Sequence, residues 1–132
     1  MKITGIRLKE LQGTMTFRGT FFEERRGMPI DIYPEFKAIG AGAVSGAVAQ
    51  GKGKYQVVRC FLFIDTDEGV TGIAGPYMGK AVSLYLDSQI KPLLMGRDPL
   101  RTELLWDLMY RNTIMGRKGD NMVAISNADI AL

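Results

Sequence analysis

The chain of 132 residues contains no histidine, which removes the most common general base and metal ligand from its chemistry. Any catalysis by these residues would need carboxylates, lysine or tyrosine. The single cysteine, Cys60, lies in an apolar stretch, where a small buried side chain is expected instead of a reactive thiol. One cysteine cannot build a disulfide framework, so the composition is typical of a cytoplasmic protein.

Long apolar runs are also missing from the sequence. The first residues lack the apolar core of a signal peptide, and no run of about 18 apolar residues predicts a membrane span. The net charge is +3 with acids and bases spread along the chain, so no concentrated basic face for nucleic acid is expected. With 46% hydrophobic residues, the chain has enough apolar side chains for the core of one domain. From its charge distribution and its short apolar runs, we expect this domain to bind neither nucleic acid nor membranes.

Three segments predict strands of an antiparallel meander. Residues 2–11 alternate apolar and charged side chains, as a half-buried strand does. Residues 55–65 are rich in β-branched and aromatic side chains, and a tight turn leads from them to a third strand at residues 70–74. Residues 16–54 carry no regular pattern, and a loop of this length is usually a lid, a binding loop or disorder.

The hydrophobic period changes after Pro76, and residues 78–132 predict a helical layer. Apolar residues recur at three- and four-residue steps from Val82 to Leu94, which indicates one face of a helix. Pro92 lacks a backbone N–H and would clash with the preceding turn, so we expect a kink or a break next to it.

Two more helices are expected in this layer. Asp98 and Pro99 predict the N-cap and the first position of a second helix. Asp120 or Asn121 could cap a third, whose small residues permit close packing. The predicted fold class is α+β, with a three-stranded antiparallel meander followed by helices. The last helix is still running at Leu132, so we expect the chain to continue.

A glycine-rich stretch raises the question of nucleotide binding. Gly46, Gly51 and Lys52 match the spacing of a P-loop, but Gly53 stands where the motif needs a hydroxyl for magnesium. A P-loop also leads into a helix N-terminus, whereas the residues after Gly53 predict a strand. We interpret the stretch as part of a flexible loop, and a small nucleotide-binding protein stays open as one alternative.

Two motifs in the helical part carry a resemblance to a known family. The first is LMGRDP at residues 94–99, followed by Glu103 and by Leu105-Trp106. The second is AISNADIAL at residues 124–132. Together they resemble the N-terminal capping domain of the enolase superfamily, in its mandelate racemase and muconate lactonizing branch. The resemblance covers the whole chain in order, from the meander to the helical layer.

The resemblance implies a two-domain enzyme, in which residues 1–132 form a cap over a modified (β/α)8 barrel. Family members abstract the proton α to a carboxylate and stabilise the resulting enediolate on Mg²⁺. Because the barrel carries the bases and the metal ligands, the resemblance assigns no catalytic and no metal-binding residue to this chain. It implies a Mg²⁺ cofactor, a C-terminal barrel domain, a small carboxylate substrate and a homo-oligomer, and the 132 residues alone should be inactive.

In the family, the cap closes two loops over the mouth of the barrel. The first corresponds here to residues 16–54. Within it, Arg25 or Arg26 could pair with a substrate carboxylate, although charges on loops are usually solvated and adjacent Glu-Arg groups can pair with one another. The aromatic candidates that would exclude water from the enediolate are Phe21, Phe22 and Tyr33.

The second loop corresponds to residues 75–79, and Tyr77 is its candidate for substrate contact. Covering the seam between cap and barrel is the alternative role of this tyrosine. Neither role requires the residue to take part in the chemical step.

We expect the full enzyme to be an acid-sugar dehydratase. The long polar first loop suits a hydroxyl-rich substrate, and residues 113–132 are loosely similar to the rhamnonate dehydratase group. A racemase, an epimerase or a cycloisomerase of the same superfamily would share this cap. A stand-alone, non-catalytic binding module is the alternative from another class.

Overall fold

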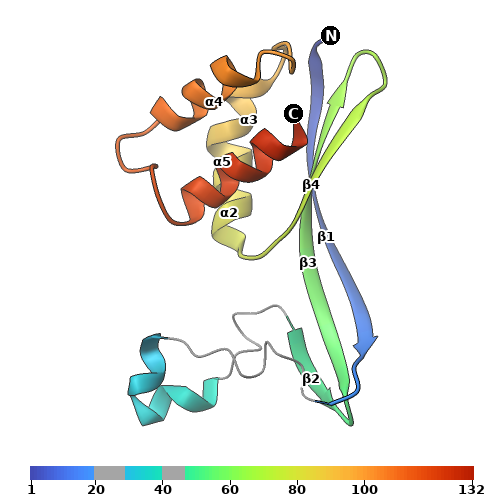
Figure 1. The fold of residues 1–132 in the computed structure, drawn as a ribbon, viewed down its shortest axis with the longest axis vertical. Helices are drawn as coiled ribbons and strands as arrows, with labels where there is room; N and C mark the ends of the chain where they lie inside the picture. The colour runs from blue at the N-terminus through green and yellow to red at the C-terminus, as the bar shows by residue number, and fades with distance from the viewer. Residues whose placement is uncertain (20–28, 40–46) are drawn as a thin grey trace. The chain divides into compact units, whose positions relative to one another are not determined.

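The computed structural model describes residues 1–19, 29–39 and 47–132. It divides into two compact units, the first formed by residues 1–10 and 60–132 and the second by residues 11–59. Strands β1 (Ile3–Thr16) and β3 (Lys54–Thr66) contribute residues to both units. Figure 1 shows the elements in their order along the chain.

The described sheet has four strands, and β3 is the strand on which the others pair. It pairs with β1, with β2 (Ala47–Gly51) and with β4 (Thr71–Tyr77). The α+β class is confirmed, but the prediction of three strands missed β2, which lies in the expected loop. The sequence of β2 is AVAQG, and only Ala47 is buried, so pairing with β3 forms this strand where the sequence shows no pattern.

The helical layer begins with one continuous run that contains three elements. These are α2 (Lys80–Tyr85), the π turn η4 (Leu86–Ile90) and α3 (Lys91–Leu94). A kink or a break was expected next to Pro92, and the run does not break there, since it continues through the proline to Leu94. The irregularity that the structure shows is the π turn η4, which ends two residues before Pro92. In an α-helix the proline ring would collide with the carbonyl four residues earlier, and the wider π turn before Pro92 relieves that collision.

Two further helices follow, α4 (Thr102–Arg111) and α5 (Asp120–Ala131). The predicted start of the second helix at Asp98 is wrong, because α4 begins at Thr102. Asp98 Oδ1 instead accepts a hydrogen bond of 3.1 Å from the backbone N–H of Leu100, which closes a turn ahead of the helix. The third helix is confirmed, but its expected cap is wrong, because Gly119 is the N-cap and Asp120 and Asn121 lie inside the helix. Every helix in the described residues is too short or too polar to cross a membrane.

The core of the first unit joins its strands to its helices. Figure 1 shows α2 to α5 gathered on one side of the strands of this unit. Strand alternation and helical spacing direct the apolar side chains of these elements towards one another. The largest fully buried side chains come from both layers: Ile3, Leu62, Ile64, Val82, Leu86, Ile90, Leu94, Leu105, Met109 and Ile125.

Helix α5 lies directly on strand β4. A side chain at Gly72 would collide with the backbone carbonyl of Ala131, so the two backbones touch at this point. The buried face of α5 carries small residues, among them Ala124 and Ala128, which are fully buried. The close packing expected from these small residues is confirmed, and it needs a glycine on the strand as its counterpart.

An ion pair on the sheet of the first unit joins β1 to β3. Arg7 Nε donates to Asp65 Oδ2 at 2.6 Å, and Arg7 Nη2 donates to Asp65 Oδ1 at 2.7 Å. The Thr71 hydroxyl donates to Asp65 Oδ1 at 2.8 Å, which links β4 to the same carboxylate. The hydrogen bonds from Arg7 and then from Thr71 lower the pKa of Asp65 from 3.8 to about 2.

This ion pair makes the stability of the fold depend on pH in the acidic range. Because the folded-state pKa of Asp65 lies below its ordinary value of 3.8, the pair contributes fully above that value and is lost as the pH falls towards 2. The Arg7 side chain is 46% exposed, so solvent screening keeps the effect small. The midpoint temperature of thermal unfolding should be higher for the wild type than for Asp65→Asn at pH 6. This difference between the two proteins should disappear at pH 2. A difference that stays constant across this range would contradict the assignment.

Candidate functional site

The glycine-rich stretch forms the turn of a β-hairpin. Gly51 pairs with Lys54 across β2 and β3, which leaves Lys52 and Gly53 as the two central residues of the turn. Both have positive φ, 49° at Lys52 and 72° at Gly53, as in the type I′ turns that match the twist of a hairpin. The backbone N–H of Phe17 also donates to the Gly53 carbonyl at 2.8 Å.

This geometry excludes a P-loop at the residues that the structure describes. A P-loop passes from a strand into a helix, whose N-terminal N–H groups meet the phosphate. Residues 51–53 pass from one strand directly into the next, and Gly46 lies outside the described residues. The long flexible loop that we expected here is therefore in part an ordered hairpin.

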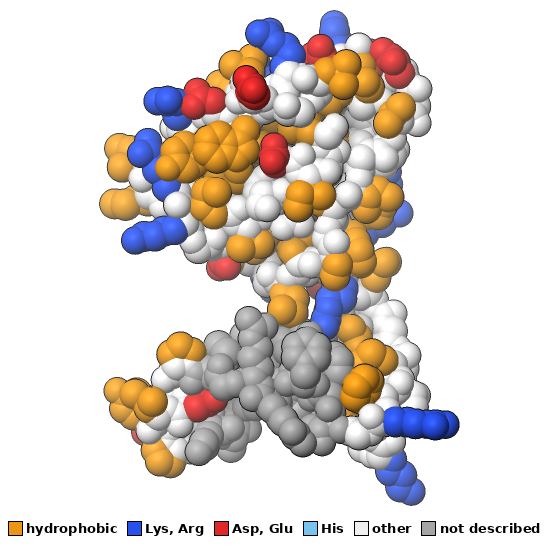
Figure 2. Space-filling model, in the orientation of Figure 1, with side chains coloured by type: hydrophobic (Ala, Val, Ile, Leu, Met, Phe, Trp, Pro, Cys, Tyr) orange, Lys and Arg blue, Asp and Glu red, His pale blue; other side chains and the backbone are white. Residues whose placement is uncertain are grey.

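The described part of the expected lid consists of two short 3-10 helices, η2 (Pro29–Ile32) and η3 (Pro34–Ile39). Tyr33 lies between them with 53% of its surface exposed. Its ring meets that of Phe36 edge to face, with centroids 6.4 Å apart. Figure 2 shows hydrophobic side chains at the surface over these helices, in agreement with the exposure of Ile32. The segment therefore presents an aromatic pair that can cover a ligand.

The other four candidates of the first loop, Phe21, Phe22, Arg25 and Arg26, lie outside the described residues. Their contact with a substrate stays a prediction. Tyr33 is the one candidate of this loop that the structure describes, and its exposure leaves the side chain available for contact.

Tyr77 lies in the core of the first unit, with 4% of its surface exposed. It is the last residue of β4 and lies opposite Cys60 of β3. Its hydroxyl lies 3.2 Å from Ser83 Oγ, and burial raises the pKa of the Tyr77 hydroxyl. Within this chain the side chain is a packing residue, and its contact with a substrate stays a prediction.

Cys60 is partly buried, as its apolar neighbours predicted. Burial raises the pKa of the Cys60 thiol, which keeps the thiol protonated and poorly nucleophilic. Among the described residues, no group of three or more His, Cys, Asp or Glu side chains could hold a metal ion. The described part of the chain therefore does not fit a Mg²⁺ site of its own.

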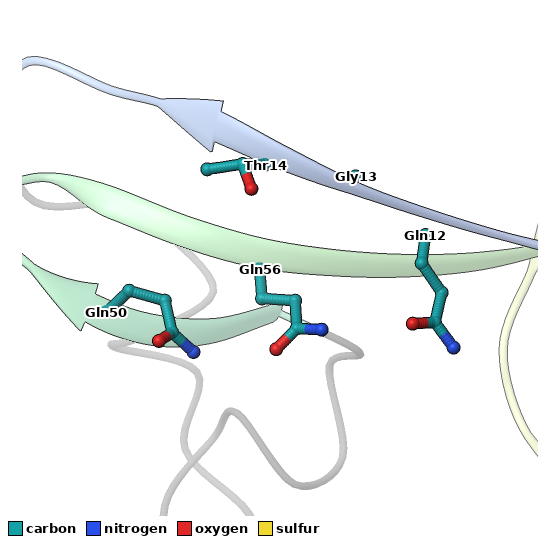
Figure 3. A pocket seen from close by; sticks show the side chains of 5 residues that line it. All are labelled: Gln12, Gly13, Thr14, Gln50 and Gln56. Atoms are coloured by element: carbon teal, nitrogen blue, oxygen red, sulfur yellow. The ribbon is translucent and has the colours of Figure 1, made fainter.

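A polar groove of about 340 Å³ lies on the sheet of the second unit. The described residues that line it come from three strands: Gln12, Gly13 and Thr14 from β1, Gln50 from β2 and Gln56 from β3. Figure 3 shows the three glutamine side chains and Thr14 projecting to the same side. The sequence did not reveal this cluster, because its members are far apart in the chain and β2 was not predicted.

The described residues form a sheet followed by a helical layer, which is the arrangement of an α+β domain. The family model of the mandelate racemase / muconate lactonizing enzyme, N-terminal domain, matches residues 47–132. The chain belongs to this family.

One curated protein is similar to part of this chain. The chain is similar to a D-galactonate dehydratase family member from Marinomonas sp. (strain MWYL1), with 40% identity over 74 residues. The match covers 54% of this chain and 18% of the relative. The chain thus spans less than a fifth of the length of that relative.

Solved structures share the fold over different lengths. A member of the enolase superfamily from Polaromonas sp. JS666 matches 99% of this chain and 28% of its own, with a TM-score of 0.59 and 23% identity. A racemase from Streptomyces coelicolor A3(2), solved with bound magnesium, matches 56% of this chain and 24% of its own. Its TM-score is 0.51 and its identity is 29%.

The hairpin turn can be tested by replacing its non-glycine residue with positive φ. Lys52→Asn should raise the free energy of unfolding by up to about 1 kcal/mol, because asparagine tolerates the left-handed conformation better than lysine. Lys54→Asn is the matched control, since Lys54 lies in β3 and should gain nothing from the change. Urea unfolding of both variants measures the effect, and equal stabilities would refute the turn assignment.

Proposed function

We propose that the chain is the substrate-capping N-terminal domain of a magnesium-dependent acid-sugar dehydratase. The observation that carries this proposal is the family match over residues 47–132, together with 40% identity to a D-galactonate dehydratase family member. In such a reaction the proton α to the carboxylate is removed, and the hydroxyl on the next carbon then leaves as water. The product is a 2-keto-3-deoxy acid.

The metal would be held by a barrel domain that is not part of these 132 residues. When bound, Mg²⁺ stabilises the negative charge that develops on the carboxylate of the substrate. The racemase from Streptomyces coelicolor that this chain resembles holds magnesium, which supports a metal requirement in the whole protein. The 132 residues alone should therefore have no activity.

In this proposal residues 1–132 form one capping domain, with a lid at residues 16–54 and a helical part at residues 78–132. The second unit, residues 11–59, contains the whole lid segment, which supports its treatment as a separate functional part. Tyr33 and Phe36 would exclude water from the reacting carbon, since their edge-to-face pair is exposed on this segment. Arg25 or Arg26 would pair with the carboxylate of the substrate.

A racemase or epimerase is the second candidate function, and the likeness to the racemase from Streptomyces coelicolor favours it. Both reactions begin with removal of the α-proton, so the lid would serve them in the same way. They differ in the second step, because a racemase returns a proton to the opposite face and a dehydratase expels a hydroxyl. The product therefore separates the two proposals.

The test uses the protein at its full natural length, with Mg²⁺ and a panel of aldonic acids that includes D-galactonate. We expect a 2-keto-3-deoxy acid to accumulate in the proton NMR spectrum, and removal of Mg²⁺ with EDTA should stop it. In D2O, exchange of the α-proton without a keto product would indicate a racemase or an epimerase instead. Neither exchange nor product across the panel would refute both proposals.

The role of the arginines can be tested in the same full-length enzyme. Arg25→Ala or Arg26→Ala should raise KM for the acid sugar about tenfold or more, because a charge-assisted hydrogen bond to the carboxylate is lost. Arg101→Ala is the matched control, since this exposed arginine lies in the first unit, before α4. Unchanged steady-state kinetics in both lid variants would remove the arginines from the substrate site.

A further inference from the structure

The polar groove of the second unit has one consistent face. Gln12 and Thr14 are two residues apart on β1, so their side chains point to the same side of the sheet. Val48 lies opposite Gln56 in the β2–β3 pair, and the register of this pair shifts between Ala49 and Gly51, so strand alternation alone does not fix the side of Gln50. Figure 3 shows Gln12, Thr14, Gln50 and Gln56 on this one side. Three strands thus place three carboxamides and a hydroxyl around one groove.

The chemistry of this lining points to a ligand that is rich in hydroxyl groups. Gln50 and Gln56 each carry a carbonyl oxygen that can accept and two N–H groups that can donate, and the Thr14 hydroxyl can do both. A sugar hydroxyl also donates and accepts, so neighbouring hydroxyls of one chain can pair with several of these side chains. The described lining carries no charge, so it suits the polyol part of an acid sugar and gives its carboxylate no cation.

The groove also lies next to the proposed lid in the sequence. Thr14 precedes the segment of residues 16–54, Gln50 lies within it and Gln56 follows it. Its volume of about 340 Å³ falls within the range of small-molecule sites, about 300–1,000 Å³. A six-carbon acid is thus a suitable occupant in size as well as in chemistry.

We propose that Thr14, Gln50 and Gln56 bind the hydroxyl groups of the acid sugar while other residues hold its carboxylate. This inference rests on the proposed function, because it assigns a binding role to this chain in that same enzyme. It differs from the sequence-based prediction, which placed every substrate contact on arginine and aromatic side chains.

The experiment measures ligand affinity in the full-length protein by calorimetric titration with D-galactonate. Gln50→Ala and Gln56→Ala should each raise the dissociation constant about three- to tenfold, as expected when a neutral hydrogen bond is lost. Galactitol has hydroxyl groups and no carboxylate, and the two variants should bind it more weakly than the wild type by the same factor. Gln89→Ala is the matched control, since this exposed glutamine lies in η4 of the first unit and should change neither constant.

The outcomes separate this inference from the proposed function. Unchanged dissociation constants in both variants would overturn the proposed binding role of the groove, even if the wild type dehydrates acid sugars. Weakened binding without turnover of any acid sugar would support the groove and refute the dehydratase. If a glutamine variant fails to fold, Thr14→Val tests the same face with a side chain of nearly equal shape. A wild type that binds neither D-galactonate nor galactitol would also overturn the inference.

Discussion

The contact between helix α5 and strand β4 is the constraint on which the first unit depends. The backbone carbonyl of Ala131 occupies the space that a side chain at position 72 would need, so only glycine fits there. Helix α5 also packs against α2 and α4, and the alanines of its buried face let these neighbours approach. A wider spacing between α5 and β4 would therefore move the helices away from the sheet and leave the leucine and isoleucine side chains between them poorly packed.

The second unit is ordered by its backbone more than by buried side chains. Its described residues contribute few side chains to a core, with Ala47 and Tyr55 buried on β2 and β3. The turn at Lys52 and Gly53 sets the register of the hairpin, and the hydrogen bond from Phe17 to Gly53 ties the end of β1 to that turn. Such a sheet leaves its polar face open, which is where the glutamines of the groove lie.

The sequence predicted those features whose signal is local and repeated. The helices and the α+β class followed from apolar spacing. Asp98 failed as a helix start because an Asp-Pro pair also begins a turn, and only the contacts of the next residues decide between the two. The strand was expected to end at Ala74, but β4 continues to Tyr77, which turns a loop residue into a buried one. The groove needed three strands in register, and no single segment carries that information.

The π turn η4 has a consequence for the spacing of the buried residues around it. Val82, Leu86, Ile90 and Leu94 succeed one another at strict intervals of four, and all four are almost completely buried. In a regular α-helix each residue advances by about 100°, so intervals of four would drift by about 40° per step and leave the core. A π turn has more residues per turn than an α-helix, so each residue in η4 rotates by a smaller angle. This offsets the rotation and keeps the four side chains on the face that packs in the core. A deletion of one residue there would preserve helicity and rotate the whole C-terminal half of the run away from its partners.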